Sequence, residues 1–445
     1  MSAGQRELHL NAFLMEAGHH EAAWRLPESN PRADFDLPHW VALAQLAEEA
    51  KFDSLFLADG PALTGSGEFR PPGQLEPLTL LTALSQHTSR IGLIATVSST
   101  YNEPYNLARR LASVDHVSGG RAGWNIVTSA TPEEAANFGI DTRLDHSSRY
   151  ARADEFLDVA KALWDSWETE AVLGDKSSGR YADLSRLHAV GHRGDHFKVA
   201  GPLNVERPPQ GHPLLVQAGS SEDGKRFAAR HAEAIFTAHQ TYERAADFYG
   251  DIKARTKAAG RDPNAVLVLP GIVPIIGSTE REARELARQL DELRVPEYGL
   301  WQLGNILESD TSTFELDRPL PDFVSARPKL EAQSRADLIV ELAQRENLTV
   351  REILSRLGGG RGHFTFIGTP DQVVDTIVAW FEGGAADGFN IMAAALPSGL
   401  ETFVDHVLPI LRRKGLFRDD YTGRTLREHY GLAVPANQFQ TSGVR

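Results

Sequence analysis

The stretch Gly120-Arg-Ala-Gly-Trp-Asn-Ile-Val-Thr-Ser129 decides the fold of this chain. Gly119 and Gly120 end a helical pattern, and the residues that follow enter a β-strand. The second half of this stretch carries aromatic and hydrogen-bonding side chains, namely Trp124, Asn125, Thr128 and Ser129. A buried strand needs no such groups at its end, whereas a parallel barrel places its ligand at the carboxyl ends of its strands. The stretch therefore predicts a ligand on the C-terminal rim of a barrel.

Apolar runs of strand length alternate with helical patterns on both sides of this stretch. We expect strands at Leu8–Leu14, Ser54–Asp59, Ile91–Ser98, Ala122–Ser129, Pro213–Gly219, Ala234–His239, Val266–Ile276 and Gly388–Leu396. Eight such strands, most of them followed by a helix, are typical of a (β/α)8 TIM barrel, which we predict as one α/β domain over residues 1–445. A doubly wound open sheet shows the same alternation and is the alternative fold.

Three longer segments interrupt the alternation, at about residues 60–75, 170–211 and 295–367. The second contains an alternating run, Gly194–Val199, that predicts a short hairpin strand. The third ends near Gly358–Gly362, which lacks the Gly-Lys-Ser/Thr ending of a phosphate loop and is predicted to be a lid hinge, with a plain surface turn as the alternative. Insertions of this length in a barrel usually lie over the active site, so we expect them over the C-terminal mouth.

The composition narrows the class of protein. The chain has 445 residues, 41% of them hydrophobic, which is ample for a large buried core. Its net charge of −14 argues against nucleic-acid and anionic-membrane partners, and the absence of cysteine excludes disulfides and thiolate chemistry. No apolar run approaches the roughly 20 residues of a membrane helix, and the N-terminus lacks a signal peptide's apolar core, so we expect a cytoplasmic protein. His188, His192 and His196 have the spacing of helical metal ligands, but nearby glycines argue against a helix, and no metal site is predicted.

Polar groups follow several of the predicted strands. Asp59 comes at the end of the second strand, Thr96 lies in the third, and Ser220 and Ser221 follow the fifth. Because a helix begins directly after the two serines, free backbone N–H groups and hydroxyls would meet there, which suits a phosphate. A loop-capping Asp59 and a serine that merely caps the helix are the structural alternatives.

His146 and Tyr150 lie four residues apart at the start of a predicted helix. This spacing brings both side chains to one face of the helix, with Arg149 beside them. The pair is either part of a ligand site or a solvated helix start.

Beyond Gly120–Ser129, a series of motifs occurs along the chain. They are Asn11-Ala12-Phe13, Ala23-Trp24-Arg25, Phe56-Leu57-Ala58-Asp59, Tyr101 with Pro104-Tyr105, Ala108-Arg109-Arg110, Asp115-His116, Asn137-Phe138-Gly139, Gly201-Pro202-Leu203, Gln217-Ala218-Gly219, Gly368-Thr369-Pro370 and Asp387-Gly388-Phe389-Asn390. With these motifs the chain resembles the flavin-dependent monooxygenases of the bacterial luciferase superfamily, in the branch of nitrilotriacetate, dibenzothiophene-sulfone and long-chain-alkane monooxygenases. The resemblance runs from about residue 8 to residue 430 and is weakest across 60–75 and 295–366.

The resemblance implies a TIM barrel that binds reduced FMN (FMNH2) delivered by a separate NAD(P)H-dependent flavin reductase. It implies that O2 reacts with the flavin to give a C4a-peroxyflavin, which places one oxygen atom in a small organic substrate. A homodimer or homotetramer is expected. The alternatives are a deazaflavin- or flavin-dependent hydride-transfer oxidoreductase of the same superfamily and a non-catalytic flavin-binding protein.

The resemblance also assigns roles to residues of this chain. Asp59 and Thr96 would contact the isoalloxazine or ribityl part of FMN. The phosphate would be held by Tyr150, Ser220 and Ser221, with His146 beside the flavin. These are the residues that the strand ends and the helix start had already singled out.

For catalysis the resemblance points to the cavity wall and the N-terminal loop. Asn125 and Trp124 would line the cavity, and His19 would orient the peroxyflavin or the substrate, with His20 as the alternative. Ala130 replaces a histidine of the alkane-oxidising relatives, so that histidine's role does not carry over. The substrate pocket is expected to be apolar with one or two cations, formed from Phe69, Trp301, Leu303, Phe314, Arg70 and Arg294.

Overall fold

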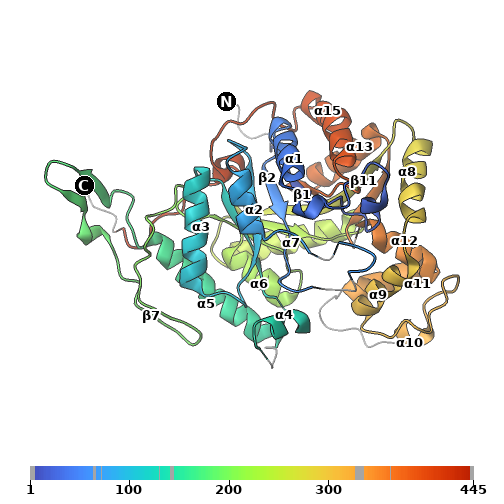
Figure 1. The fold of residues 1–445 in the computed structure, drawn as a ribbon, viewed down its shortest axis with the longest axis horizontal. Helices are drawn as coiled ribbons and strands as arrows, with labels where there is room; N and C mark the ends of the chain where they lie inside the picture. Colours follow the sequence, from blue (N-terminus) through green and yellow to red (C-terminus); the bar gives the residue numbers. More distant parts are fainter. Residues whose placement is uncertain are drawn as a thin grey trace.

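The computed structural model describes residues 6–63, 67–71, 73–129, 131–140, 145–325, 335–360 and 362–440. Its centre is a closed barrel of eight parallel strands (Figure 1). The barrel strands are β1 (His9–Leu14), β2 (Ser54–Leu57), β3 (Gly92–Ser98), β4 (Ala122–Val127), β9 (Leu214–Gln217), β10 (Ala234–Thr237), β11 (Leu267–Ile276) and β13 (Gly388–Ile391). Pairing of β1 with β13 and of β10 with β11 closes the circle, which confirms the TIM barrel and rules out the open sheet.

Helices between the strands cover the outside of the barrel. They are α1 (Leu37–Glu49), α2 (Pro77–Leu84), α3 (Pro104–Ser118), α5 (His146–Asp165), α6 (Glu222–His231), α7 (Tyr242–Ala258), α8 (Glu280–Glu292) and α13 (Pro370–Glu382). Local sequence explains where several begin: the Thr279 side chain accepts from the N–H of Glu282 at the start of α8, and Thr369 and Gln372 cap α13 around Pro370. No helix within the described parts of the chain has the length and apolar character needed to cross a bilayer.

The N-terminal end of the barrel is filled by α16 (Leu426–His429), the last helix in the described part of the chain. Leu426 and Tyr430 belong to the apolar cluster inside the barrel. The Tyr430 hydroxyl donates to Asn11 Oδ1 at 2.6 Å, and Asn11 Nδ2 donates to Asn390 Oδ1 at 3.1 Å. Asn11 and Asn390 therefore link β1, β13 and the segment after α16 at the N-terminal end of the barrel. The opposite, C-terminal end is the one at which a ligand would bind.

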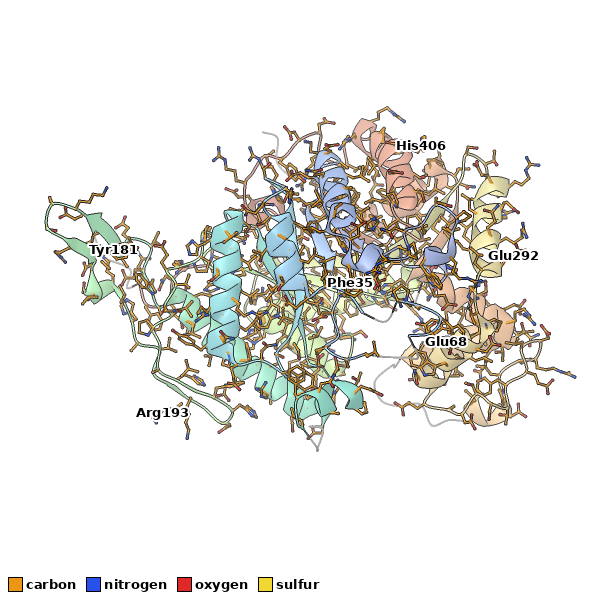
Figure 2. The ribbon with its side chains drawn as sticks, in the orientation of Figure 1. Phe35, Glu68, Tyr181, Arg193, Glu292 and His406 are labelled. Atoms are coloured by element: carbon orange, nitrogen blue, oxygen red, sulfur yellow. The ribbon has the colours of Figure 1, made fainter. Side chains whose placement is uncertain are left out.

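The insertion at residues 170–211 does not lie over the mouth. Helix α5 has already carried the chain back to the N-terminal end of the barrel before the insertion begins, and β9 starts again from that end. The insertion forms two hairpins, β5 (Val172–Asp175) with β6 (Arg180–Ala182) and β7 (His192–Arg193) with β8 (Lys198–Val199). The insertion forms an arm beside α5, on which Phe197 packs with its ring centroid 5.5 Å from that of Phe156. The β5–β6 hairpin, with Tyr181 near its far end, stands away from the barrel (Figures 1 and 2). The predicted hairpin near residues 194–199 is present, but the expected position of this insertion was wrong.

The insertion after α8 lies beside the C-terminal end of the barrel (Figure 1). It folds into α9 (Pro296–Leu307), α10 (Asp322–Ser325), α11 (Arg335–Glu346) and α12 (Val350–Gly360) around a small apolar core of its own. A strand that the sequence analysis missed, β12 (Phe364–Gly368), then extends the sheet beside β11. Gly358–Gly360 are the last residues of α12, so the predicted hinge is in part a helix end, and Arg361 lies outside the described residues.

Candidate active site at the barrel mouth

Polar groups of β3 and β4 meet inside the barrel below the mouth. Thr96 and Asn125 are register partners, and Asn125 Nδ2 donates to Thr96 Oγ1 at 2.9 Å. Both side chains are buried, and Asn125 Oδ1 has no hydrogen-bond partner among the described residues. An unpaired buried acceptor costs about 1–3 kcal/mol, so Asn125 is suited to accept a hydrogen bond from a ligand.

Trp124 does not line the cavity, contrary to the expectation from the resemblance. Successive residues of a strand face opposite sides, and Trp124 faces the helices. Its ring packs on Phe156 of α5 with centroids 5.7 Å apart, and its indole N–H donates to the Val97 carbonyl at 2.9 Å. Trp124 therefore fixes α5 against the sheet, and only its neighbour Asn125 points inward.

Asp59 lies half-buried in the loop after β2. Burial, followed by the nearby charge of Glu76, raises the pKa of its carboxyl from 3.8 to about 6. This rim carboxyl is therefore protonated at mildly acidic pH, and the protonated form can donate a hydrogen bond to a ligand.

The loop Gln217–Ser221 leads from β9 into α6. Ser221 is the N-cap of α6 and accepts from the N–H of Gly224 at 3.1 Å. The N–H groups of Glu222 and Asp223 have no acceptor within the described part of the chain. Free N–H groups and the positive end of the helix dipole make this turn suited to an anion.

The hydroxyl of Tyr150 reaches the same loop from α5. It is hydrogen-bonded to Ser221 and Thr128, and burial raises its pKa, so it stays protonated. A Cβ on Gly219 would lie 2.5 Å from Tyr150 Oη and 2.3 Å from Gln217 Nε2, so only glycine leaves both groups room. Gln217 is buried, and its Oε1 has no partner among the residues described.

His146 joins the two helices. Its Nδ1 lies 2.8 Å from Asp223 Oδ2, its Nε2 lies 3.3 Å from Ser221 Oγ, and its ring centroid is 5.0 Å from that of Tyr150. We call His146, Tyr150, Ser220 and Ser221, with the first turn of α6, the α5–α6 site. All four predicted residues come together there, and Asp223 is an additional member that the sequence analysis missed.

A cleft lies between the ends of β9 and β10 and the helices α11 and α12, and it reaches the α5–α6 site at Ser220. Its volume is about 800 Å³ including its opening to solvent. One wall is the barrel rim and the other is formed by α11 and α12, and the lining includes Ala218, Ser220, Thr237, Gln240, Ile339 and Leu357. The third insertion therefore forms one wall of this cleft, as predicted for an insertion at the mouth.

His19 lies in the loop after β1, completely buried. Gly18 has φ +132° and passes so close to the loop after β13 that a Cβ would lie 2.4 Å from the Ala394 carbonyl oxygen, and His19 N–H donates to Ala393 at 2.9 Å. Neither ring nitrogen has a hydrogen-bond partner among the described residues. Burial, then the charges of His363 and Arg70, lowers the pKa of His19 to about 3, so the ring is neutral at physiological pH. The alternative, His20, instead accepts from the N–H of Ala22 at 3.2 Å and lies 3.8 Å from Asp291.

The two cations expected in the substrate pocket, Arg70 and Arg294, each form an ion pair with a glutamate. Arg70 lies 3.2 Å from Glu16, and Arg294 lies 2.8 Å from Glu21. Buried guanidinium groups require such partners, which the sequence spacing does not reveal. Leu303 and Phe314 belong to the insertion's own core, and Trp301 is 40% exposed, so these side chains do not form the expected apolar pocket with one or two cations.

Comparison with known proteins places the chain in a family. The family model described as luciferase-like monooxygenase matches residues 13–387. N-acetyl-S-(2-succino)cysteine monooxygenase of Bacillus subtilis (strain 168) is 46% identical, covering 99% of this chain and 100% of that protein. Nitrilotriacetate monooxygenase component A of Aminobacter aminovorans is 45% identical, covering 97% of this chain and 98% of that protein.

A solved structure extends the similarity to three dimensions. Riboflavin lyase (RcaE), crystallised with modified FMN and riboflavin, superimposes with a TM-score of 0.85 at 31% identity, covering 96% of this chain and 97% of that one. The match spans the barrel and most of its insertions. The chain therefore belongs to the luciferase-like monooxygenase family and is a flavin-dependent monooxygenase.

Proposed function

We propose that this chain binds reduced FMN at the barrel mouth, receives it from a separate NAD(P)H-dependent flavin reductase, and oxygenates a small organic substrate. The observation that carries the proposal is the convergence of His146, Tyr150 and Ser221 on the first turn of α6. The relative named component A works as one part of a two-component monooxygenase, which supports a separate reductase.

The α5–α6 site has the chemistry that a phosphate requires. Two free N–H groups and the hydroxyls of Tyr150, Ser220 and Ser221 are donors, and charge-assisted hydrogen bonds to a phosphate are among the strong ones. The glycine at 219 leaves the Tyr150 hydroxyl room to reach this loop. These groups would hold the phosphate end of FMN.

The barrel interior would hold the ring end. Asn125 Oδ1 is available to accept a hydrogen bond, and Thr96 fixes the Asn125 amide. When bound, reduced flavin supplies the electrons that activate O2 for transfer of one oxygen atom to the substrate. Asp59 contributes a rim carboxyl whose raised pKa lets it donate at mildly acidic pH.

His19 is proposed to orient the reacting groups. Since its ring is neutral, it can donate one hydrogen bond and accept another without carrying charge into the site. The wall formed by α11 and α12 would help to keep water from the cleft, which protects reactive species formed there.

Anaerobic titration with flavins tests the proposal. We expect reduced FMN to bind more tightly than riboflavin or a deazaflavin, and substrate-dependent oxygen uptake to require an added flavin reductase. Tight binding of the deazaflavin without oxygen-dependent turnover would instead establish the hydride-transfer alternative.

We also propose that the protein is a homodimer or homotetramer. The arm at residues 170–211 exposes Leu173, Tyr181 and Leu184 at 44%, 68% and 76%. A two-stranded hairpin has little stability of its own, and exposed apolar side chains on it favour contact with another subunit. Light scattering measures the mass directly, and a monomeric mass would contradict this proposal.

A further inference from the structure

We propose that Asp223 is a positioning residue that fixes His146 and thereby gives the α5–α6 site its preference for phosphorylated over unphosphorylated flavin. This inference rests on the proposed function, because it requires the FMN phosphate to bind at the first turn of α6. Asp223 lies on that turn, so without such a role its negative charge would oppose phosphate binding.

The contacts of Asp223 show why its charge acts through His146. Asp223 Oδ2 accepts from His146 Nδ1 at 2.8 Å and from Ser147 Oγ at 3.1 Å, and Asp223 Oδ1 pairs with Arg226. The hydrogen bond from His146 is the largest cause that lowers the pKa of Asp223, so the carboxylate stays ionised. Its charge is therefore already engaged by donors, and the histidine stands between it and Ser221.

The carboxylate determines which way the imidazole can act. With Nδ1 committed to Asp223, only Nε2 remains, and it points to Ser221 Oγ at 3.3 Å. Asp223 thereby holds the Nε2 side of the His146 ring toward the turn where the phosphate would bind.

Within the described part of the chain, few other charged groups face the His146 ring. From α5, Tyr150 packs on the ring of His146, and Arg149 lies directly before Tyr150 in the chain. From α6, Ser221, Asp223 and, through Asp223, Arg226 face it. Glu222 lies on the same turn but points elsewhere, to Arg255 at 2.9 Å and to Lys225 at 3.5 Å.

Glu222 therefore provides a matched control. Asp223→Asn and Glu222→Gln each remove one negative charge from the first turn of α6, but only the first removes a partner of His146. If general repulsion of the phosphate dominated, both substitutions would tighten FMN. Our proposal predicts opposite signs, with Asp223→Asn weakening FMN about five- to tenfold at pH 8 and Glu222→Gln leaving it unchanged or tighter.

The comparison of FMN with riboflavin separates positioning from a merely structural effect. If Asp223 acts by holding the His146 ring toward the phosphate, Asp223→Asn should weaken the binding of FMN. The affinity for riboflavin, which has no phosphate, should remain equal in the variant and the unmodified protein.

The measurement is fluorescence titration of the protein with oxidised FMN and with riboflavin at pH 8, with nitrogen NMR of the His146 ring as a second readout. An equal loss of affinity for FMN and for riboflavin in Asp223→Asn, or tightening of FMN by Asp223→Asn as by Glu222→Gln, would overturn the inference. If instead Tyr150→Phe and Ser221→Ala leave the ratio of FMN to riboflavin affinity unchanged, the proposed phosphate position itself fails.

Discussion

Two histidines near the barrel mouth, His146 and His19, lie in opposite environments. At the α5–α6 site, the His146 side chain is 47% exposed and both of its nitrogens lie near partners on α6. At the other site, His19 is fully buried and neither nitrogen has a partner among the described residues. The first arrangement is suited to a charged group that exchanges water for protein donors. The second is suited to a neutral ring in a dry environment, where a ligand would be its hydrogen-bond partner.

The largest expected effect comes from removing the buried histidine. His19→Phe should lower substrate-coupled oxygen uptake about 100-fold, within the range typical of a hydrogen-bonding catalytic group, and should change FMN affinity by less than about twofold. Turnover should be measured with an excess of reductase, and binding by titration.

His20→Gln is the matched control, because His20 neighbours His19 in the chain but already pairs with Asp291. If His19→Phe lost as much FMN affinity as turnover, His19 would contribute to flavin binding and not to turnover alone. Since the pKa of His19 is about 3, its removal should also leave the pH profile of turnover between pH 5 and 8 unchanged in shape.

An intermediate effect is expected at the exposed site. Tyr150→Phe removes a donor whose charge-assisted hydrogen bond is worth roughly 1.5–3 kcal/mol, so FMN should bind about tenfold more weakly or worse. Gly219→Ala should act in the same direction, because its Cβ would lie 2.5 Å from Tyr150 Oη and displace the hydroxyl. Both affinities can be measured by fluorescence quenching.

Riboflavin sharpens this test. It lacks the phosphate, so its affinity should change little in Tyr150→Phe, and an equal loss for both ligands would place Tyr150 beside another part of the flavin. Gly219→Ala in the Tyr150→Phe background should add less than it does alone, because the clash and the lost donor involve the same hydroxyl.

The smallest effect is expected on the melting temperature, from a substitution of the half-buried Asp59. Its pKa is raised from 3.8 to about 6, so its contribution to stability is greatest below pH 4 and is lost as the pH rises through about 6. Asp59→Asn should therefore gain melting temperature relative to the unmodified protein between pH 4 and pH 7, by roughly 2 °C. A difference that stays constant over this range would show that Asp59 is not desolvated in solution.

The sequence by itself determined the barrel and the α5–α6 site because both depend on local patterns. Eight strand-length runs separated by helices specify the closed barrel, and all eight appear near their expected positions. His146 and Tyr150 share a helix face through their four-residue spacing, and Ser221 directly precedes a helix that it caps. Neighbouring residues and helix geometry are enough for such predictions.

Only the tertiary structure decided which distant groups meet. The pairing of Asp223 with His146 spans two helices, and that of Arg70 with Glu16 spans two loops, so no spacing along the chain predicts them. The outward direction of Trp124 depends on strand register, where a shift of one residue exchanges the two faces. The arm at residues 170–211 does not lie over the mouth, because it follows α5, and α5 ends at the opposite end of the barrel. Charges, faces and insertions are thus fixed by long-range packing, which local sequence does not contain.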